Sequence, residues 1–377
     1  MDFDYIIIGG GLSGLQLCYH IINEPKLSHL KIGLFEQNKK NTNDKTFCFW
    51  QKKEDKSWTK LISKTWNYTN IGHQSQLHKL DLLDYNYHKI ESIDFYQYMY
   101  KLIEQSNQIK YINEKVIATK ETSLGVEVKT DTNHYNCGYI FDSRVKNSLE
   151  SIEEKSIYVN QNFLGFKVKF QQSVLKADTY TMMDFNCRWE NSSSFMYILP
   201  QNTTEALFEF TLFTPYTLIK DEYKLKIKEY LNRNYPNIQY IINDIEYGEI
   251  PMTNFNFKAN DTDKITHIGT AGGWVKASTG YSFKFAEKNC KKIVEQILTN
   301  QKPVGIVKKK KYHFYDRLFL KILKNENTVG PRIFNDMFKK VPLNKVFKFL
   351  DEETTLLEDV KIILKLPYLP FLKALVN

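Results

Sequence analysis

Three glycines near the start of the chain have a spacing that suits the binding of a dinucleotide. Gly9, Gly11 and Gly14 form a Gly-x-Gly-x-x-Gly pattern, which follows a short apolar run and opens a segment with helical periodicity. In this pattern the first glycine permits a tight turn, the second lets the backbone approach a pyrophosphate, and the third allows a helix to pack closely on a strand. The N-terminus of that helix then presents unpaired N–H groups to phosphate oxygens.

A carboxylate stands where the same pattern requires one. The apolar run at 31–35 ends at Glu36, 22 residues after Gly14, and a carboxylate at this place accepts hydrogen bonds from ribose hydroxyls. The order of apolar run, glycine turn, helical segment and second apolar run predicts the strand–helix–strand unit that the motif needs. The chain contains no second copy of the motif, which argues against a reductase with two dinucleotide domains.

A second glycine cluster lies far along the chain. Its four glycines are more than one turn needs: Gly269, Gly272, Gly273 and Gly280. A helix is expected at about 281–298. In flavoproteins with an N-terminal glycine fingerprint, a late segment of this kind closes over the flavin, and the N-terminus of the helix would stabilise negative charge on the reduced ring. The segment is expected to close over the flavin, and the alternative is a simple turn between a strand and a helix. The residues expected to contact the cofactor here are Gly269, Thr270, Gly280 and Tyr281.

One carboxylate, Glu209, lies inside an apolar segment at 205–214. Read with a period of two, one face of this expected strand is wholly apolar, and Glu209 lies on the other face. That second face looks either to water, as in a half-exposed strand, or into a cavity. In an apolar cavity the carboxyl group would stay protonated, because desolvation raises its pKa.

The composition is that of a globular protein with free thiols. The 377 residues are 42% hydrophobic and 25% charged, enough for a large core and two or three domains. The five cysteines form no C-x-x-C pair and are odd in number, which argues against a disulfide framework and against a zinc site, so no metal is expected. The net charge of +9 suits nucleic acid, an anionic membrane or an anionic cofactor. Nucleic acid is disfavoured because the basic residues stand among apolar ones and no nucleic-acid motif is present.

Seven segments occur in an order that resembles a known family. They are DYIIIGGGLSGL, YIFDSR, TMMDF, FMYILP, ALFEFTLF, GTAGGWVKASTGYSF and FLDEETTLLEDVKIILKLPYLPFLKAL. Together they resemble the flavin-dependent lycopene cyclases of bacteria, of the lycopene β-cyclase type, over nearly the whole chain. The glycine fingerprint is shared with many flavoproteins, whereas TGYSF and the glutamate-containing strand are more specific.

The resemblance implies a reaction and the roles of several residues. The acidic motif of the family aligns with LFEFT, which places Glu209 at the position of the acid–base catalyst. Phe210 stands where some members have a second acid, a departure that argues against a paired-carboxylate mechanism. The implied reaction is the non-redox, acid-catalysed cyclisation of lycopene ψ end groups to β rings, giving β-carotene via γ-carotene. The implied cofactor is reduced FAD, with NAD(P)H as electron donor.

An alkene is a very weak base, so protonation alone does not explain the reaction. A carboxyl group with a raised pKa is also a weaker proton donor. The driving force must therefore come from stabilisation of the carbocation, by an anionic reduced flavin and by aromatic faces.

The expected fold is α/β, with a Rossmann-type FAD-binding domain interleaved with a β-rich substrate domain and followed by a helical C-terminal part. The expected domains are 1–48, 94–150 and 259–305 for FAD, 49–93 and 151–258 for the substrate, and 306–377 for a membrane-facing segment. The expected substrate-domain strands are 157–170, 179–186, 194–200 and 205–214. YIFDSR is expected to return to the FAD-binding domain, and its Asp142 and Arg144 are either functional or a structural ion pair.

A C40 hydrocarbon dissolves in the bilayer, so peripheral membrane contact is expected for such an enzyme. No stretch reaches about 18–20 apolar residues, so no spanning helix is expected. Residues 308–324 hold seven basic residues and one acid, with Phe314, Leu318 and Ile322 at helical spacing. This pattern is typical of a helix on an anionic membrane surface, and the alternative is a packed helix with a solvated basic face. The expected location is cytoplasmic, peripheral on the inner face of the cell membrane.

Two other functions remain open. One is another FAD-dependent enzyme on the same scaffold, a monooxygenase or an isoprenoid reductase, acting on an apolar substrate. The other is a non-catalytic, membrane-bound carotenoid carrier, which would bind the polyene without flavin dependence. The sequence also leaves open the ring type, whether one or both ends are cyclised, and the oligomeric state.

Overall fold

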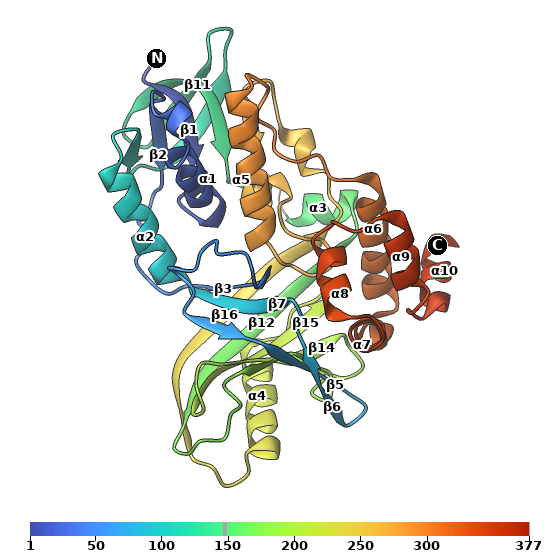
Figure 1. Ribbon diagram of the computed structural model, residues 1–377. Helices are drawn as coiled ribbons and strands as arrows, with labels where there is room; N and C mark the ends of the chain where they lie inside the picture. Colours follow the sequence, from blue (N-terminus) through green and yellow to red (C-terminus); the bar gives the residue numbers. More distant parts are fainter. Residues whose placement is uncertain (146–148, 377) are drawn as a thin grey trace.

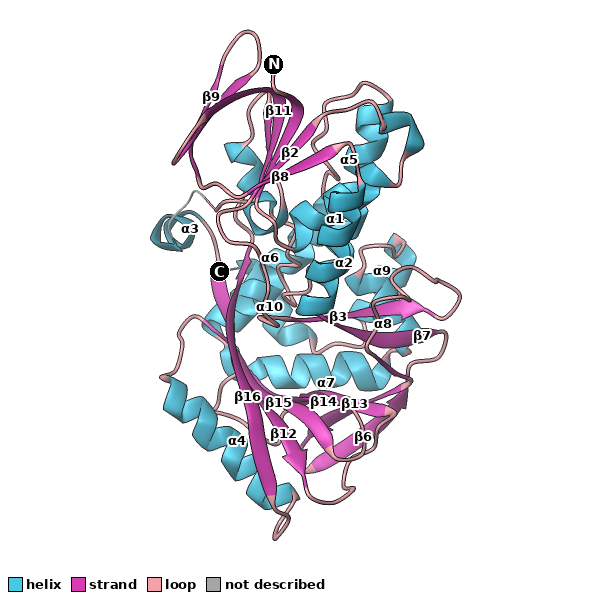
Figure 2. Cartoon of the chain, turned by 90° about the vertical axis from the view of Figure 1, so that its left-hand side faces the viewer, coloured by secondary structure: helices cyan, strands magenta, loops and turns pink. Residues whose placement is uncertain are grey.

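The computed structural model describes residues 1–145 and 149–376, and within these ranges the strands form three sheets (Figures 1 and 2). Two of the sheets are seven-stranded and one is three-stranded. The helices are α1 (Leu12–Ile22), α2 (Ser92–Gln105), α3 (Leu149–Lys155), α4 (Lys220–Asn234), α5 (Phe283–Leu298), α6 (Lys310–Asn325), α7 (Gly330–Lys340), α8 (Leu343–Leu350), α9 (Leu356–Ile363) and α10 (Tyr368–Val376).

The first sheet is built around the apolar strand that precedes the glycine turn. This strand, β1 (Phe3–Ile8), pairs in parallel with β2 (Ile32–Phe35) on one side and with β11 (His134–Asp142) on the other. Its isoleucines are buried, because both faces of the sheet are covered. The predicted strand–helix–strand unit and the return of YIFDSR to this sheet are confirmed. The other strands are β8 (Ile109–Ile112), β9 (Val116–Glu121), β10 (Val126–Thr130) and β17 (Ile265–His267).

Helices α1, α2 and α5 pack against the first sheet and share one apolar core with it. The thiol of Cys290 in α5 donates a hydrogen bond to the carbonyl of Ser13 in α1, at 3.6 Å. The late helix therefore lies directly against the helix that follows the first glycine turn. It begins at Phe283 and ends at Leu298, as predicted apart from two residues at its start.

The second sheet is mostly antiparallel and contains the four strands expected for the substrate domain. These are β12 (Tyr158–Phe170), β13 (Thr179–Asp184), β14 (Ser194–Pro200) and β15 (Glu205–Thr214). Three further strands complete the order β16-β12-β15-β14-β13-β5-β6, namely β5 (Tyr68–His73), β6 (Gln76–Asp81) and β16 (Tyr240–Thr253). The sequence pattern did not predict β16, which pairs along the whole length of β12.

Helices cover both faces of the second sheet (Figure 2). On one face Phe208 and Phe210 pack with α4, and on the other Leu207 and Phe213 pack with α6 and α7. Both faces of β15 are therefore buried, which explains why this strand is almost entirely apolar.

A three-stranded sheet lies between the two large sheets (Figures 1 and 2). In it β7 (Tyr85–Glu91) pairs with β3 (Thr46–Lys52) and with β4 (Lys64–Trp66). Phe49 of β3 stacks on Phe283 at the start of α5, with ring centroids 4.4 Å apart. Because β3 crosses the expected boundary at residue 48, this sheet joins the parts of the chain on either side of it. The domain boundaries themselves stay a prediction.

The C-terminal part is helical, as predicted, but the apolar face of α6 does not meet a membrane. Leu318, Phe319, Ile322 and Leu323 are buried in the large core, and Phe314 is 44% exposed. Of the two interpretations of this pattern, the structure contradicts the lipid-facing helix and bears out the packed one, because the core at the second sheet already covers this face. No helix in the described part of the chain is long and apolar enough to span a bilayer.

Candidate active site

The first glycine turn has the conformation and the free space that a nucleotide needs. Gly9 has a left-handed φ of +103°, and a Cβ at that position would overlap the hydroxyl of Ser143. A Cβ on Gly14 would overlap the carbonyl oxygen of Gly9, whereas a Cβ on Gly11 would meet no atom within 4 Å. Gly9 and Gly14 thus form the turn, and Gly11 leaves its outer side open.

Glu36, directly after β2, stabilises this turn through its carboxylate. One of its carboxylate oxygens accepts a hydrogen bond from the N–H of Gly10 at 2.8 Å, and the other accepts one from the N–H of Asn38 at 3.1 Å. A carboxylate can accept about four hydrogen bonds, so half of its capacity is left for another donor. The side chain is half-buried beside the glycine turn, where the sequence pattern places it.

The late glycine segment spans the space between the first turn and the second sheet. Gly269 and Gly280 have left-handed φ values of +62° and +74°. A Cβ on Gly269 would lie 2.9 Å from the hydroxyl of Ser13, and one on Gly280 would overlap the side-chain oxygen of Gln161 in β12. Gly269 therefore lies against α1. Gly280 lies against the substrate-domain sheet.

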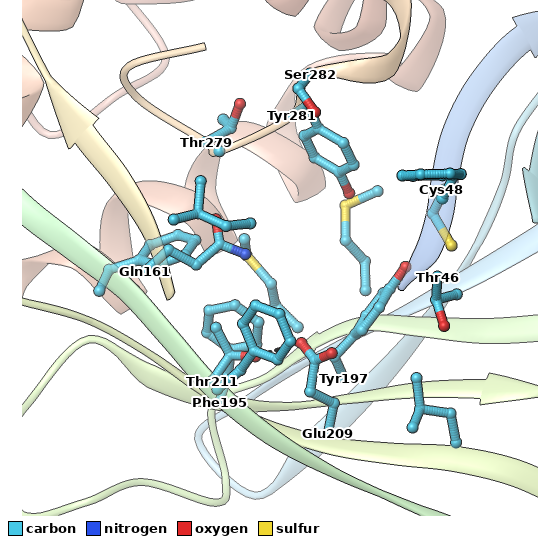
Figure 3. Close-up of a pocket in the computed structure, with 18 of the residues that line it drawn as sticks. Thr46, Cys48, Gln161, Phe195, Tyr197, Glu209, Thr211, Thr279, Tyr281 and Ser282 are labelled. Atoms are coloured by element: carbon cyan, nitrogen blue, oxygen red, sulfur yellow. Dashed lines mark hydrogen bonds between the residues drawn. The ribbon is translucent and has the colours of Figure 1, made fainter. Parts of the chain in front are cut away.

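Glu209, Gly280 and Tyr281 line one cavity of about 150 Å³ (Figure 3). Its walls come from β12, β14 and β15 below, from β3 at the side, and from residues 279–283 above. A cavity of this volume in an apolar setting holds a ligand about as large as benzene. Thr270 does not line this cavity but a second one, of about 1010 Å³, on which Trp274 and Lys258 also lie.

The surroundings of Glu209 favour the neutral form of its carboxyl group. Glu209 is 7% exposed, and its Oε1 accepts a hydrogen bond from the hydroxyl of Thr211 at 2.7 Å. Burial raises the pKa of Glu209 well above its ordinary value, the negative charge of Glu246 raises this pKa further, and the Thr211 hydrogen bond lowers it in part. The prediction that Glu209 faces a cavity and not water is confirmed by this burial.

Three tyrosine hydroxyls meet beside Glu209. The hydroxyl of Tyr87 is 2.8 Å from that of Tyr197 and 2.9 Å from that of Tyr281. Tyr197 lies directly opposite Glu209 in the β14–β15 ladder. Burial raises the pKa of all three hydroxyls, so they stay neutral. Their rings give the wall beside the acid an aromatic surface (Figure 3).

Two polar atoms at the wall of this cavity are buried without a hydrogen-bond partner among the described residues. They are Oε1 of Gln161 and Oγ1 of Thr279. Buried polar atoms are normally hydrogen-bonded, so these two atoms fit a polar ligand group at the cavity wall, and the open side of Gly11 leaves room for a ligand at the first turn.

Asp142 and Arg144 form an ion pair at the end of β11. Nη2 of Arg144 is 2.7 Å from Oδ2 of the fully buried Asp142, and its Nη1 donates to the carbonyl of Val116 at 2.8 Å. The pair ties β11 to the start of β9, which favours the structural role.

Three groups around Glu209 were missed by reasoning from the sequence. They are Tyr87 on β7, Tyr197 on β14 and Glu246 on β16. Tyr197 lies in the FMYILP segment and had a signal of its own, because it alternates with apolar neighbours on a recognised strand. No sequence pattern identified Glu246, because only the pairing of β12 with β16 brings it near Glu209.

The fold and the glycine turn define the architecture of Rossmann-type FAD-binding flavoenzymes. The chain is similar to a geranylgeranyl bacteriochlorophyll reductase-like protein from Thermoplasma acidophilum, with a TM-score of 0.60 and 11% identity over 98% of each chain. It is also similar to the flavin-dependent brominase Bmp2, with a TM-score of 0.59 and 12% identity over 93% of each chain. The halogenase PltM, solved with phloroglucinol and FAD, has a TM-score of 0.53 and 11% identity over 96% of this chain and 84% of its own. At these identities the likeness shows the fold alone.

The sequence identifies the family of the chain more specifically than the fold does. A family profile described as "Lycopene cyclase protein" matches residues 4–376. The chain belongs to the lycopene cyclase family. No curated protein sequence matches it.

Proposed function

We propose that the protein is a lycopene β-cyclase that uses reduced FAD and converts the ψ end groups of lycopene to β rings. The observation that carries the proposal is the carboxyl group of Glu209, buried at the wall of an aromatic cavity that residues 279–283 also line, where burial raises its pKa. Membership of the lycopene cyclase family supports the class of substrate.

In the proposed reaction the substrate gains one proton and later loses one. Glu209 donates its proton to the terminal double bond of the end group, which leaves a tertiary carbocation. The electron pair of the neighbouring double bond forms the ring C–C bond, and the ring cation then loses a proton to set the ring double bond. The Glu209 carboxylate would take up that proton, so the acid is regenerated and no electron is transferred. The rings of Tyr197 and Tyr281 each stabilise the cation by about 0.5–2 kcal/mol.

FAD in its reduced, anionic form would supply negative charge beside the carbocation. Gly9, Gly11, Gly14 and Glu36 would hold its pyrophosphate and ribose. Gly269, Thr270, Gly280 and Tyr281 would lie along the rest of the cofactor, and the donor that reduces it would be NAD(P)H. The free space outside Gly11 and the unpaired atoms of Gln161 and Thr279 support this arrangement.

Expression in a bacterial host that accumulates lycopene tests the proposal, with the pigments separated by chromatography. Conversion to β-carotene is expected, and an accumulation of γ-carotene would indicate a monocyclase. Unchanged lycopene in cells that contain the flavin-loaded protein would contradict the proposal. The purified enzyme adds a second test, because a cyclase consumes no NAD(P)H beyond that needed to reduce its flavin, whereas an isoprenoid reductase consumes one equivalent per double bond reduced.

The substrate would reach the enzyme from a membrane through its C-terminal helices. Helices α9 and α10 and the turn between them expose ten large apolar side chains, which we call the C-terminal apolar surface: Leu356, Leu357, Val360, Ile363, Leu364, Tyr368, Leu369, Leu372, Leu375 and Val376. A surface of this kind is typical of an interaction site.

Charge makes an anionic bilayer the proposed partner of this surface. Residues 306–377 hold fifteen Lys and Arg against eight Asp and Glu, a net +7 of the +9 of the whole chain. Asp359 and Glu358 are already paired with lysines, whereas Lys361 and Lys365 have no ion-pair partner among the described residues. Each lysine near anionic lipid adds about 1 kcal/mol. The proposed membrane contact thus lies on the C-terminal apolar surface, within the expected membrane-facing segment 306–377 but not on α6.

Flotation with vesicles tests this membrane contact. The protein is expected to float with vesicles rich in anionic phosphatidylglycerol and to do so less with pure phosphatidylcholine. The double variant Leu357→Asp, Leu364→Asp is expected to lose flotation, because both side chains are more than three-quarters exposed, at 77% and 79%. Leu124→Asp, in an exposed turn of the first sheet, is the matched control. Equal flotation of the double variant and the control would exclude this surface.

A further inference from the structure

The cavity acid has a carboxyl partner on a strand that is not its neighbour in the sheet. Gly165 of β12 lies opposite Glu209 of β15 on one side and opposite Glu246 of β16 on the other. Both glutamates therefore lie on one face of the sheet, with only a glycine between them. Their Cα atoms are two strand spacings, about 10 Å, apart, and the two side chains meet over Gly165, where each carboxyl group shifts the pKa of the other.

Gly165 leaves the room for this pairing. A Cβ at this position would lie 3.1 Å from Cγ of Glu246, 3.5 Å from Cβ of Glu209 and 2.8 Å from Cδ1 of Leu207. Gly165 is not among the glycines with a left-handed φ, so the backbone does not require a glycine here. A side chain at this position would press on Leu207 and on Glu246, and it would stand between the two glutamates.

The two carboxyl groups have different surroundings. Glu209 lines the apolar cavity and accepts a hydrogen bond from Thr211. Glu246 is half-buried behind it, where it accepts a hydrogen bond from the hydroxyl of Thr46 at 3.1 Å and faces the cation of Lys167. Negative charge is therefore better tolerated on Glu246, and a shared proton is better placed on Glu209.

The pKa shifts agree with this division. Burial raises the pKa of both groups. For Glu246 the rise in pKa is opposed by the positive charge of Lys167, by the hydroxyl of Thr46 and by the neighbouring Glu209 as a hydrogen-bond donor. For Glu209 the negative charge of Glu246 adds to the effect of burial.

We propose that Glu246 is a positioning residue for the acid: the two carboxyl groups share one proton, Glu246 holds the negative charge, and this keeps the proton on Glu209 at the cavity wall. The role of that proton in cyclisation rests on the proposed function, whereas the pair itself does not. After Glu209 gives up its proton, two adjacent carboxylates repel each other, and this repulsion favours return of the proton.

The other charged or titratable groups that face the pair do not replace Glu246. On β7, Lys89 and Glu91 form an ion pair of 2.6 Å. On β3, burial raises the pKa of Cys48 to about 12, and in the late segment burial raises the pKa of Tyr281, so both stay neutral. Asp244 is paired with Lys167 at 3.0 Å. Among the described residues, Glu246 is the carboxylate whose charge raises the pKa of Glu209.

Infrared titration of the purified flavoprotein tests the pair without any measurement of activity. The carbonyl band of a protonated carboxyl group, assigned to Glu209 by its loss in Glu209→Gln, is expected to persist at neutral pH. In Glu246→Gln this band is expected to disappear at lower pH than in the wild type, because the nearby negative charge is gone. Glu246→Asp is expected to restore much of the wild-type titration, and Glu249→Gln, on the opposite face of β16, to leave it unchanged.

A second variant covers the case in which Glu246→Gln does not fold. Lys167→Met removes the cation that faces Glu246 from a partly exposed site, so a second proton is expected to enter the pair at higher pH than in the wild type. If the band of Glu209 titrates identically in the wild type, Glu246→Gln and Lys167→Met, the proposal is overturned. It is equally overturned if Glu209 shows no protonated band at neutral pH.

Activity then separates this inference from the proposed function. In an active cyclase, the alkaline limb of the rate–pH profile is expected to move to lower pH in Glu246→Gln, with a loss of rate that grows with pH. If Glu246→Gln cyclises lycopene with the same rate–pH profile as the wild type, the proposed proton sharing is overturned and the proposed function is not. A coupled titration in a protein that leaves lycopene unchanged would overturn the proposed function and leave the pair standing.

Discussion

The two large sheets build their parts of the site in different ways. In the first sheet the functional groups follow the ends of strands and are mostly backbone, as at Gly9, Gly11 and Gly14 after β1. In the second sheet they lie in the middle of strands and are side chains, as at Glu209 and Tyr197. A parallel sheet is covered on both faces, so its ligand site is at the carboxyl ends of the strands. The second sheet leaves a cavity over one face, where side chains from several strands meet.

This difference shows that the glycine turn and the acid site, the two halves of the candidate active site, depend on different features of the fold. The glycine turn depends on local backbone conformation and on close packing of a few consecutive residues. The acid site depends on strand register, because a shift by one residue would turn Glu209 to the α4 face. Substitutions in the two halves should therefore separate chemistry from cofactor binding.

The largest effect is expected from Glu209→Gln. Loss of a general acid lowers a rate by about 10²–10⁴-fold, while the amide keeps the shape of the side chain and can still hydrogen-bond. Cyclisation by the reduced flavoprotein is expected to fall by this factor with flavin content unchanged. Glu205→Gln, on the same strand and paired with Lys169 at the surface, is the matched control. Near-normal cyclisation by Glu209→Gln would remove this residue from the chemistry.

The same variant is expected to be more stable than the wild type at neutral pH. A carboxyl group whose pKa is raised on folding contributes stability below its ordinary pKa, and this contribution is lost as the pH rises towards the raised value. The Glu209→Gln protein does not lose this stability as the pH rises, because glutamine does not ionise in the unfolded chain. Thermal unfolding across the acid-to-neutral range checks this, and parallel curves for the two proteins would contradict the raised pKa.

A smaller effect is expected in the first sheet, where two glycines should behave differently. Gly14→Ala is expected to lower the free energy of unfolding by about 1–3 kcal/mol, as for overpacking, because its Cβ would overlap the carbonyl oxygen of Gly9. Gly11→Ala meets no protein atom within 4 Å, so it should unfold like the wild type and lose only flavin affinity. Urea unfolding of the flavin-free proteins and flavin titration measure the two effects. Tight flavin binding by Gly11→Ala would show that the cofactor does not approach this turn.

The smallest effect is expected from Thr211→Val. This change removes the hydroxyl that donates to Oε1 of Glu209, and one hydrogen bond is worth about 0.5–1.5 kcal/mol, so the rate should fall about 2- to 13-fold. Because the donor stabilises the carboxylate, its loss raises the pKa of Glu209 further, and the alkaline limb of the rate–pH profile should move to higher pH. This direction is opposite to that expected for Glu246→Gln. Thr211→Ser, which keeps the hydroxyl, should behave like the wild type.

Much of the fold could be predicted because its signals are local. The strand before Gly9, the helix at 283–298 and the four strands between 158 and 214 all have patterns in their own residues. The strand β16 was missed because residues 241–245 and other positions along it are exposed, so it lacks the apolar alternation that identifies a strand. The burial of α6 could not be predicted, since amphipathicity does not tell whether sheet or lipid covers the apolar face.

The sequence by itself determined the glycine turn, the carboxylate after β2, the strand that carries Glu209 and membership of the family. Each depends on residues that are close along the chain, or on patterns that a profile can match. Only the tertiary structure decided that Gly165 separates Glu209 from Glu246, that three tyrosines meet beside the acid, and that α9 and α10 hold the exposed apolar surface. The physical reason is that the pKa of a buried acid and the exposure of a helix face depend on groups that register and packing bring from distant parts of the chain.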